Sequence, residues 1–101
     1  MSGSKYDGVI EAVRYKNGRI LWVRAYERRG ATFSDIVLID RKTLLQRIAE
    51  GRRFVTGRRR ADLASTFSVG KPVKLVESDG RQVVTTAGAA SRDELEDVPL
   101  L

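Results

Sequence analysis

The sequence predicts one small domain that is mainly β with one short helix, an α+β arrangement. Two turn dipeptides, Asn17-Gly18 and Asp79-Gly80, lie between runs rich in β-branched residues, and only residues 40–50 repeat apolar side chains at helical spacing. A chain of 101 residues favours a single domain. The expected order is β-β-β-α-β-β-β, forming a small curled sheet or an SH3/OB-like barrel capped by the helix.

Asn17-Gly18 is expected to join the first two strands, residues 6–16 and 19–29. Asn-Gly favours the positive φ angles of a type I′ turn, and a two-residue loop sets the register of its strands. An unbroken register pairs Lys16 with Arg19, Tyr15 with Ile20, Val13 with Trp22, Glu11 with Arg24, Val9 with Tyr26 and Asp7 with Arg28. Two cross-strand ion pairs, Glu11 with Arg24 and Asp7 with Arg28, therefore follow from this register.

Neither face of this hairpin is plainly a solvent face. One face carries the small and aliphatic residues of a core, namely Tyr6, Ile10, Ala12, Leu21, Val23 and Ala25. The other carries larger apolar residues and two arginines, namely Val9, Val13, Tyr15, Ile20, Trp22, Tyr26, Arg24 and Arg28. A hairpin with two apolar faces is either covered on both sides, as in a barrel, or presents one face to a partner.

Residues 32–39 predict a third strand, which should be central because 36–39 are apolar on both sides. Asp40 is placed to cap the helix over 40–50, where its carboxylate accepts from free backbone amides. The apolar residues of this helix are Leu44, Leu45, Ile48 and Ala49, and Gly51 is a stop signal.

Further strands are expected at 53–56, ending at Gly57, and at 63–69. Gly70-Lys71-Pro72 should begin a last hairpin, in which 73–76 pairs with 82–86 about Asp79-Gly80. That register places Leu75 opposite Val84 and Val76 opposite Val83. We expect a disordered start at 1–5, one β-rich domain at 6–86 and an acidic, flexible tail at 87–101, although Leu95, Val98, Leu100 and Leu101 offer apolar groups for docking.

The net charge of +6 is unevenly distributed. Beyond Gly88, Arg92 stands against four carboxylates, which gives −3 and leaves +9 for the rest of the chain. Fourteen of the nineteen basic residues are arginines, whose planar donor fork suits phosphate and carboxylate recognition. A solvated, arginine-rich surface without a ligand explains the same composition equally well.

The chain contains no cysteine and no histidine. Disulfides, thiolate nucleophiles, Cys/His zinc sites and histidine general bases are thereby excluded. The sequence has no apolar run of membrane-spanning length and no signal-peptide core at its start, so we expect a cytoplasmic protein without membrane contact.

The basic segment 52–60 is the first candidate site. It holds Arg52, Arg53, Arg58, Arg59 and Arg60 around a short apolar strand. Arginines at the ends of such a strand could neutralise several phosphates and make binding steeply dependent on salt. A solvated loop that keeps the protein soluble is the competing interpretation.

The hairpin face with Trp22, Tyr26, Arg24 and Arg28 is the second candidate. Aromatic rings interleaved with arginines on a sheet can stack nucleic-acid bases. The same aromatics are, however, more typical of a core, and Glu11 and Asp7 on this face would repel phosphates.

No enzymatic site is expected. Asp35 and Asp40 fall on opposite faces of a strand, and Asp62 follows the arginine run, so no acid–base pair is apparent. Neither of the common glycine-rich phosphate loops occurs. The match of 68–71 to the S-x-x-K nucleophile pattern lacks its companion motifs. We therefore expect no catalytic residue, cofactor or metal.

These observations lead to two hypotheses. The first is a non-enzymatic nucleic-acid-binding module for RNA or DNA, which uses the arginines of 52–60 and, as stacking residues, Trp22 and Tyr26. The second is a protein-interaction or assembly module, such as a homodimer, or a binder of another protein. Its interface would be the apolar hairpin face of Val9, Val13, Tyr15 and Trp22. The acidic tail either covers the basic surface, contacts another protein or simply aids solubility.

Overall fold

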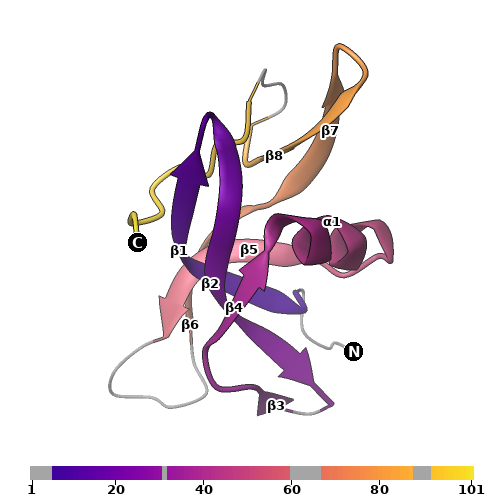
Figure 1. Cartoon of the computed structure of the whole chain (residues 1–101). Coiled ribbons are helices and arrows are strands. Elements are labelled where there is room, and N and C mark those ends of the chain that lie inside the picture. Colours follow the sequence, from indigo (N-terminus) through magenta and orange to yellow (C-terminus); the bar gives the residue numbers. More distant parts are fainter. Residues whose placement is uncertain (1–5, 31, 60–66, 88–91) are drawn as a thin grey trace.

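The computed structural model describes residues 6–30, 32–59, 67–87 and 92–101. Its elements are strands β1 (Gly8–Lys16), β2 (Arg19–Arg29), β3 (Thr32–Phe33) and β4 (Val37–Asp40), helix α1 (Arg41–Ala49), and strands β5 (Phe54–Arg59), β6 (Phe67–Pro72), β7 (Lys74–Ser78) and β8 (Arg81–Thr85). The protein is mainly β with one short helix, as the sequence predicts (Figure 1).

One curled sheet contains six of these strands in the order β3-β2-β1-β5-β6, with β4 also paired to β2, while β7 and β8 form a separate hairpin. The curvature brings the two ends of the sheet together. The rings of Phe33 in β3 and Phe67 in β6 lie 4.9 Å apart, centroid to centroid. The sheet is therefore curled into a half-barrel (Figure 1), and the contact between these two rings bridges its ends.

The Asn17-Gly18 turn forms as predicted, with φ angles of +54° and +76°. Lys16 pairs with Arg19 and Tyr15 with Ile20, and the predicted partners Val9 and Tyr26 also meet. Between them, however, the register shifts twice: Leu21 is an extra residue in β2, and Glu11 is an extra residue in β1. The two bulges cancel, which is why the register is as predicted at both ends of the hairpin.

The central part of the predicted register is therefore wrong. Val13 pairs with Val23 and not with Trp22, while Arg24 pairs with Ala12 and not with Glu11. Neither expected ion pair forms. The Asp7 carbonyl does accept from the Arg28 amide at 2.7 Å, but the Asp7 carboxylate accepts from the Arg53 amide at 2.9 Å.

The sheet is covered on both faces, by two separate cores. The larger core lies between the sheet, α1 and the β7–β8 hairpin, and contains Ile10, Val13, Ile20, Val23, Ala25, Ile39, Leu44, Phe54, Val73, Val84 and Leu95. The smaller core fills the curl with Val9, Tyr26, Val55 and Phe67, flanked by Tyr6 and Phe33. The sequence places Val13 and Ile20 on the same face of the hairpin as Val9 and Tyr26. Because of the two bulges, the side chains of Val13 and Ile20 instead pack in the larger core.

Helix α1 confirms the predicted cap and stop. The Asp40 carboxylate accepts from the Thr43 amide at 2.8 Å, and this bond holds the pKa of the Asp40 carboxyl below its ordinary value. Leu44 is fully buried, and Leu45 and Ile48 pack against the larger core. Gly51 follows the helix with a φ of +98°, a conformation that favours glycine.

The prediction of one central strand over 32–39 is wrong. Residue Ser34 interrupts it, because its hydroxyl accepts from the Glu27 amide at 3.1 Å and donates to the Asp35 carbonyl at 2.7 Å. The second half, β4, pairs with β2 and with no other strand in the described part of the chain. Ile36 and Leu38 are consequently 39% and 62% exposed.

Strand β5 lies parallel to β1 and continues to Arg59, beyond its predicted end at Gly57. The glycine belongs inside the strand because a Cβ there would collide with the Ser68 carbonyl oxygen of β6. Strand β6 also includes Gly70-Lys71-Pro72, which we expected to begin the next hairpin. The first residues of the predicted strand 63–69 lie outside the described part of the chain.

The last hairpin has the predicted turn and register. Asp79 and Gly80 adopt φ angles of +52° and +78°, and the predicted pairs Leu75–Val84 and Val76–Val83 form. In Figure 1 this hairpin lies above α1, whereas β3 lies below it.

Residues 92–101 of the expected tail pack against the domain. Leu95 is 5% exposed within the larger core. The Val13 amide donates to the Pro99 carbonyl at 3.0 Å, and the Val13 carbonyl accepts from the Leu101 amide at 2.8 Å. The chain end thus lies alongside β1 and pairs with it through one isolated parallel bridge between Val13 and Leu100, which is the docking alternative left open by the sequence.

Candidate anion-binding pocket

The described arginine side chains of the predicted basic segment 52–60 lie in different surroundings. Arg52 lines a pocket near the end of α1, together with Arg28, and Arg53 is exposed. Arg58 lines a hollow that also contains two acidic residues, Glu11 and Asp97. Arg59 lies over aromatic rings of the smaller core, and Arg60 lies outside the described residues. The described arginines of this segment therefore do not form one rim.

The predicted stacking residue Tyr26 belongs to the smaller core. The residue is 8% exposed, and its ring centroid lies 5.2 Å from that of Phe67. The Cζ atom of Arg59 lies 4.6 Å from the Tyr26 centroid, and that of Arg28 lies 4.6 Å from the Phe33 centroid. Burial, with the nearby Glu11 carboxylate, raises the pKa of the Tyr26 hydroxyl. These arginines stack on the protein's own rings, so little of the Tyr26 face is open to a base.

The two other residues of that predicted face lie outside this cluster. Trp22 is partly exposed and pairs across the sheet with Arg14 and Asp40. Arg24 is exposed and pairs with Leu38 of β4. Trp22 and Arg24 thus belong to an open part of the sheet surface, on the predicted face, and Trp22 pairs with no other aromatic ring among the described residues.

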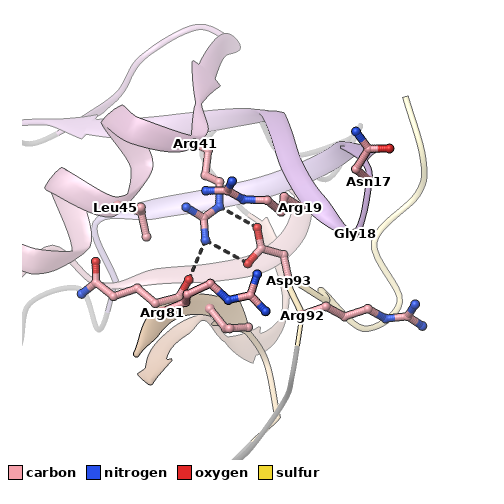
Figure 2. A pocket seen from close by; sticks show the side chains of 10 residues that line it. Asn17, Gly18, Arg19, Arg41, Leu45, Arg81, Arg92 and Asp93 are labelled. Carbon is pink, nitrogen blue, oxygen red and sulfur yellow. Dashed lines mark hydrogen bonds and ion pairs between the residues drawn. The ribbon is translucent and has the colours of Figure 1, made fainter. Parts of the chain in front are cut away.

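A different group of arginines gathers around the start of α1. Arg19, Arg41, Arg81 and Arg92 line one pocket of about 470 Å³, together with Asn17, Gly18, Leu45, Gln82, Val83 and Asp93. We call it the Arg41 pocket. Figure 2 shows the guanidinium groups of Arg19 and Arg81 on the two sides of the Arg41–Asp93 pair, and Arg92 pointing outward. The four arginines come from β2, α1, β8 and the C-terminal segment.

Asp93 organises this pocket. Its carboxylate accepts from the amides of Ile20 at 2.7 Å and Val84 at 3.0 Å. It also accepts from Arg41 through Nε at 2.7 Å and through a terminal nitrogen at 3.2 Å (Figure 2). Burial alone would raise the pKa of the Asp93 carboxyl, but these hydrogen bonds outweigh it and hold the pKa below its ordinary value. Asp93 is therefore ionised and fully occupied at neutral pH.

The pocket keeps a positive surplus. Four guanidinium groups surround one carboxylate, which gives a formal charge of +3. Arg19, Arg81 and Arg92 are exposed, and none of them has a carboxylate within 4.0 Å among the described residues. Exposed arginine forks from three segments, next to one already neutralised pair, are suited to binding a phosphate or another oxyanion.

Sequence reasoning missed this pocket, although it contains a usable signal. Each turn dipeptide is followed directly by an arginine, as Asn17-Gly18-Arg19 and Asp79-Gly80-Arg81. A type I′ turn places the next residue at the tip of its hairpin. The convergence of these two tips with Arg41 and the C-terminal segment depends on tertiary packing, which no local pattern reveals.

Two of the three aspartates considered as acid–base residues lie in the described part of the chain. Asp40 caps α1 and Asp35 is exposed, while Asp62 lies outside the described residues. Among the residues described, no three acidic side chains gather as metal ligands would. None of the helices described is long and apolar enough to span a bilayer.

Comparison with known proteins adds no functional information. No protein-family model matches the chain. No curated protein and no solved structure matches it significantly. The geometry of its own residues is thus the basis for a functional proposal.

Proposed function

We propose that this domain is a non-enzymatic nucleic-acid-binding module that holds the phosphate backbone in the Arg41 pocket. The observation that carries the proposal is the convergence of Arg19, Arg81 and Arg92 around the Arg41–Asp93 pair, with a formal surplus of +3. Arg19, Arg81 and Arg92 would contact phosphate oxygens. Arg41 would act as a positioning residue, because Asp93 already occupies part of its donor fork.

Energetics favours a backbone ligand over a base-specific one. Arginine binds phosphate oxygens in a bidentate manner, and each neutralised phosphate releases counterions. The aromatic residues that could stack bases are mostly inside the fold, since Tyr26 and Phe67 are each 8% exposed. We therefore propose binding that depends strongly on salt and weakly on base sequence, to RNA or DNA. The chain lacks cysteine, which fits action in a reducing compartment, and we propose the cytoplasm.

Fluorescence anisotropy with labelled single- and double-stranded oligonucleotides tests this proposal. The pocket variant is Arg19→Ala/Arg81→Ala, and the matched control is Arg14→Ala/Lys74→Ala, which likewise removes two exposed cations but outside the Arg41 pocket. At low salt the wild type should bind in the micromolar range, as should the control. The pocket variant should bind at least about tenfold more weakly, from the loss of charge-assisted hydrogen bonds. Equal weakening in both variants would contradict a site at this pocket.

A protein-interaction module is the second candidate function. The interface expected from the sequence cannot serve, because Val9 and Val13 are fully buried. Strand β4 offers a different surface, where Leu38 is 62% exposed beside Arg24 and partly exposed Trp22. Light scattering on the wild type and on Leu38→Ser tests self-association at this surface. A concentration-dependent mass that Leu38→Ser abolishes supports it, and a monomeric wild type at high concentration excludes it.

A further inference from the structure

The structure contains a second arginine pocket, at the other end of α1. It has a volume of about 400 Å³ and is lined by Glu27, Arg28, Arg29, Gly30, Arg47 and Arg52. We call it the Arg47 pocket. Its formal charge is +3, the same as that of the Arg41 pocket.

The two pockets share one construction. In each, a buried carboxylate holds an arginine of α1: Asp93 bonds to Arg41 at 2.7 Å, and Glu27, which is 7% exposed, bonds to Arg47 at 3.1 Å. The other arginines of the Arg47 pocket divide into two kinds. Arg28 is engaged, because it donates to the Tyr6 carbonyl and lies over the Phe33 ring.

Arg29 and Arg52 remain available for a ligand. Both are exposed, and neither has a carboxylate within 4.0 Å in the part of the chain that the structure describes. Arg52 is also kept at the end of the helix by its backbone, because its amide donates to the Arg47 carbonyl at 3.1 Å. The Arg47 pocket thus presents two unneutralised guanidinium groups beside a neutralised pair, as the Arg41 pocket does.

Both pockets lie along the same two elements, α1 and β2. Arg41 and Arg47 are six residues apart in the helix, a rise of about 9 Å. Arg19 and Arg29 are ten residues apart in β2, at most ~33 Å along an extended strand. One phosphate group cannot reach both pockets. A polymer whose phosphates recur about every 3.4 Å along one strand of a duplex can.

We infer that the Arg47 pocket is a second phosphate site, and that the two pockets bind one continuous phosphodiester strand along α1. This inference rests on the proposed function and adds its ligand class, an oligonucleotide stretch of at most roughly ten nucleotides in place of a mononucleotide or a free phosphate. Arg29 and Arg52 contact one part of the strand, and Arg19, Arg81 and Arg92 contact the other.

Binding of labelled oligothymidylates of 4 and 15 nucleotides tests the inference. Three matched variants each lose two exposed cations: Arg19→Ala/Arg81→Ala, Arg29→Ala/Arg52→Ala and Arg14→Ala/Lys74→Ala. The wild type should bind the 15-mer at least about tenfold more tightly than the 4-mer, since two linked contacts act together. Either pocket variant should reduce 15-mer affinity about tenfold or more and abolish most of this length preference, whereas the Arg14→Ala/Lys74→Ala variant should retain it.

The outcomes separate the two proposals. One outcome is that Arg29→Ala/Arg52→Ala binds the 15-mer as tightly as the control Arg14→Ala/Lys74→Ala, and only Arg19→Ala/Arg81→Ala binds it more weakly. The second site is then refuted and the proposed function stands. If the wild type binds neither oligonucleotide at low salt, both are refuted. A 15-base-pair duplex, measured in parallel, shows whether the strand is taken from single- or double-stranded nucleic acid. Thermal unfolding of each variant confirms that these surface changes leave the fold intact.

Discussion

Replacing Asp93 by asparagine should destabilise the protein far more than a surface substitution of the same kind. Asparagine has nearly the shape of aspartate, but it has one acceptor oxygen and a donor amide in place of two acceptor oxygens. Asp93 accepts from Ile20 and Val84 through different oxygens, so the new amide group must face one of these buried N–H groups. The bidentate ion pair with Arg41 is lost as well.

The expected loss follows from these contacts. A buried N–H left without a partner costs about 1–3 kcal/mol, and removing one partner of a buried ion pair costs about 3–5 kcal/mol. The Arg41 side chain is 16% exposed, so solvent recovers part of its interaction. We therefore expect Asp93→Asn to lower the free energy of unfolding by about 2–4 kcal/mol, or Tm by roughly 10–25 °C for a domain of this size.

Urea and thermal unfolding measure this loss, with Asp97→Asn as the matched control. Asp97 lies on the same segment, is exposed and has a φ of +61°, which asparagine tolerates well. The control should stay within about 0.5 kcal/mol of the wild type. If Asp93→Asn behaves like Asp97→Asn, then Asp93 does not hold the C-terminal segment to the domain, and the construction of the Arg41 pocket is refuted.

Two further predictions concern the same contacts and the sheet. The pKa of the Asp93 carboxyl is lower in the folded state than its unfolded value of about 3.9. The contribution of this carboxylate to the free energy of unfolding is therefore complete above the unfolded pKa, and it is lost as the pH falls toward the folded pKa. Urea unfolding at pH 7, 4 and 3 should therefore show the stability gap between wild type and Asp93→Asn narrowing below about pH 4, and a constant gap would contradict the assignment. Gly57→Ala should lower the free energy of unfolding by about 1–3 kcal/mol, because the added Cβ would collide with the Ser68 carbonyl oxygen. An unchanged midpoint of chemical unfolding would show that β5 and β6 do not approach so closely.

Local chemistry predicts much of this fold. Asn17-Gly18 and Asp79-Gly80 form the turns that their conformational preferences favour, and Asp40 caps α1 as its side chain allows. The register of the last hairpin is predicted correctly because no bulge interrupts it. Each of these features depends on residues close together in the chain.

Features that depend on distant contacts escape prediction. The bulges at Glu11 and Leu21 allow β1 and β2 to follow the curl of the sheet, and no local composition marks them. Ser34 divides an apolar run through a hydrogen bond to Glu27 on another strand. The acidic composition of the C-terminal segment suggests a solvated tail, yet its Asp93 is buried where two backbone amides and Arg41 require an acceptor.

The candidate site, too, depends on contacts between residues that are distant in the sequence. Counting arginines along the chain singles out 52–60, where arginines are dense in sequence. The structure instead concentrates positive charge where Arg19, Arg41, Arg81 and Arg92 meet, although they are spread over most of the chain. Of the residues predicted from sequence, Arg28 and Arg52 do lie in the second arginine pocket.

Mapping of backbone and arginine side-chain NMR signals during titration with a 15-mer oligonucleotide tests nucleic-acid binding at the Arg41 pocket most directly. Large shifts should fall on Gly18, Arg19, Arg81 and Arg92, and they should reverse as salt is raised, since phosphate contacts weaken by counterion competition. Shifts confined to the surface of Trp22 and Leu38, or no shifts at low salt, would contradict it.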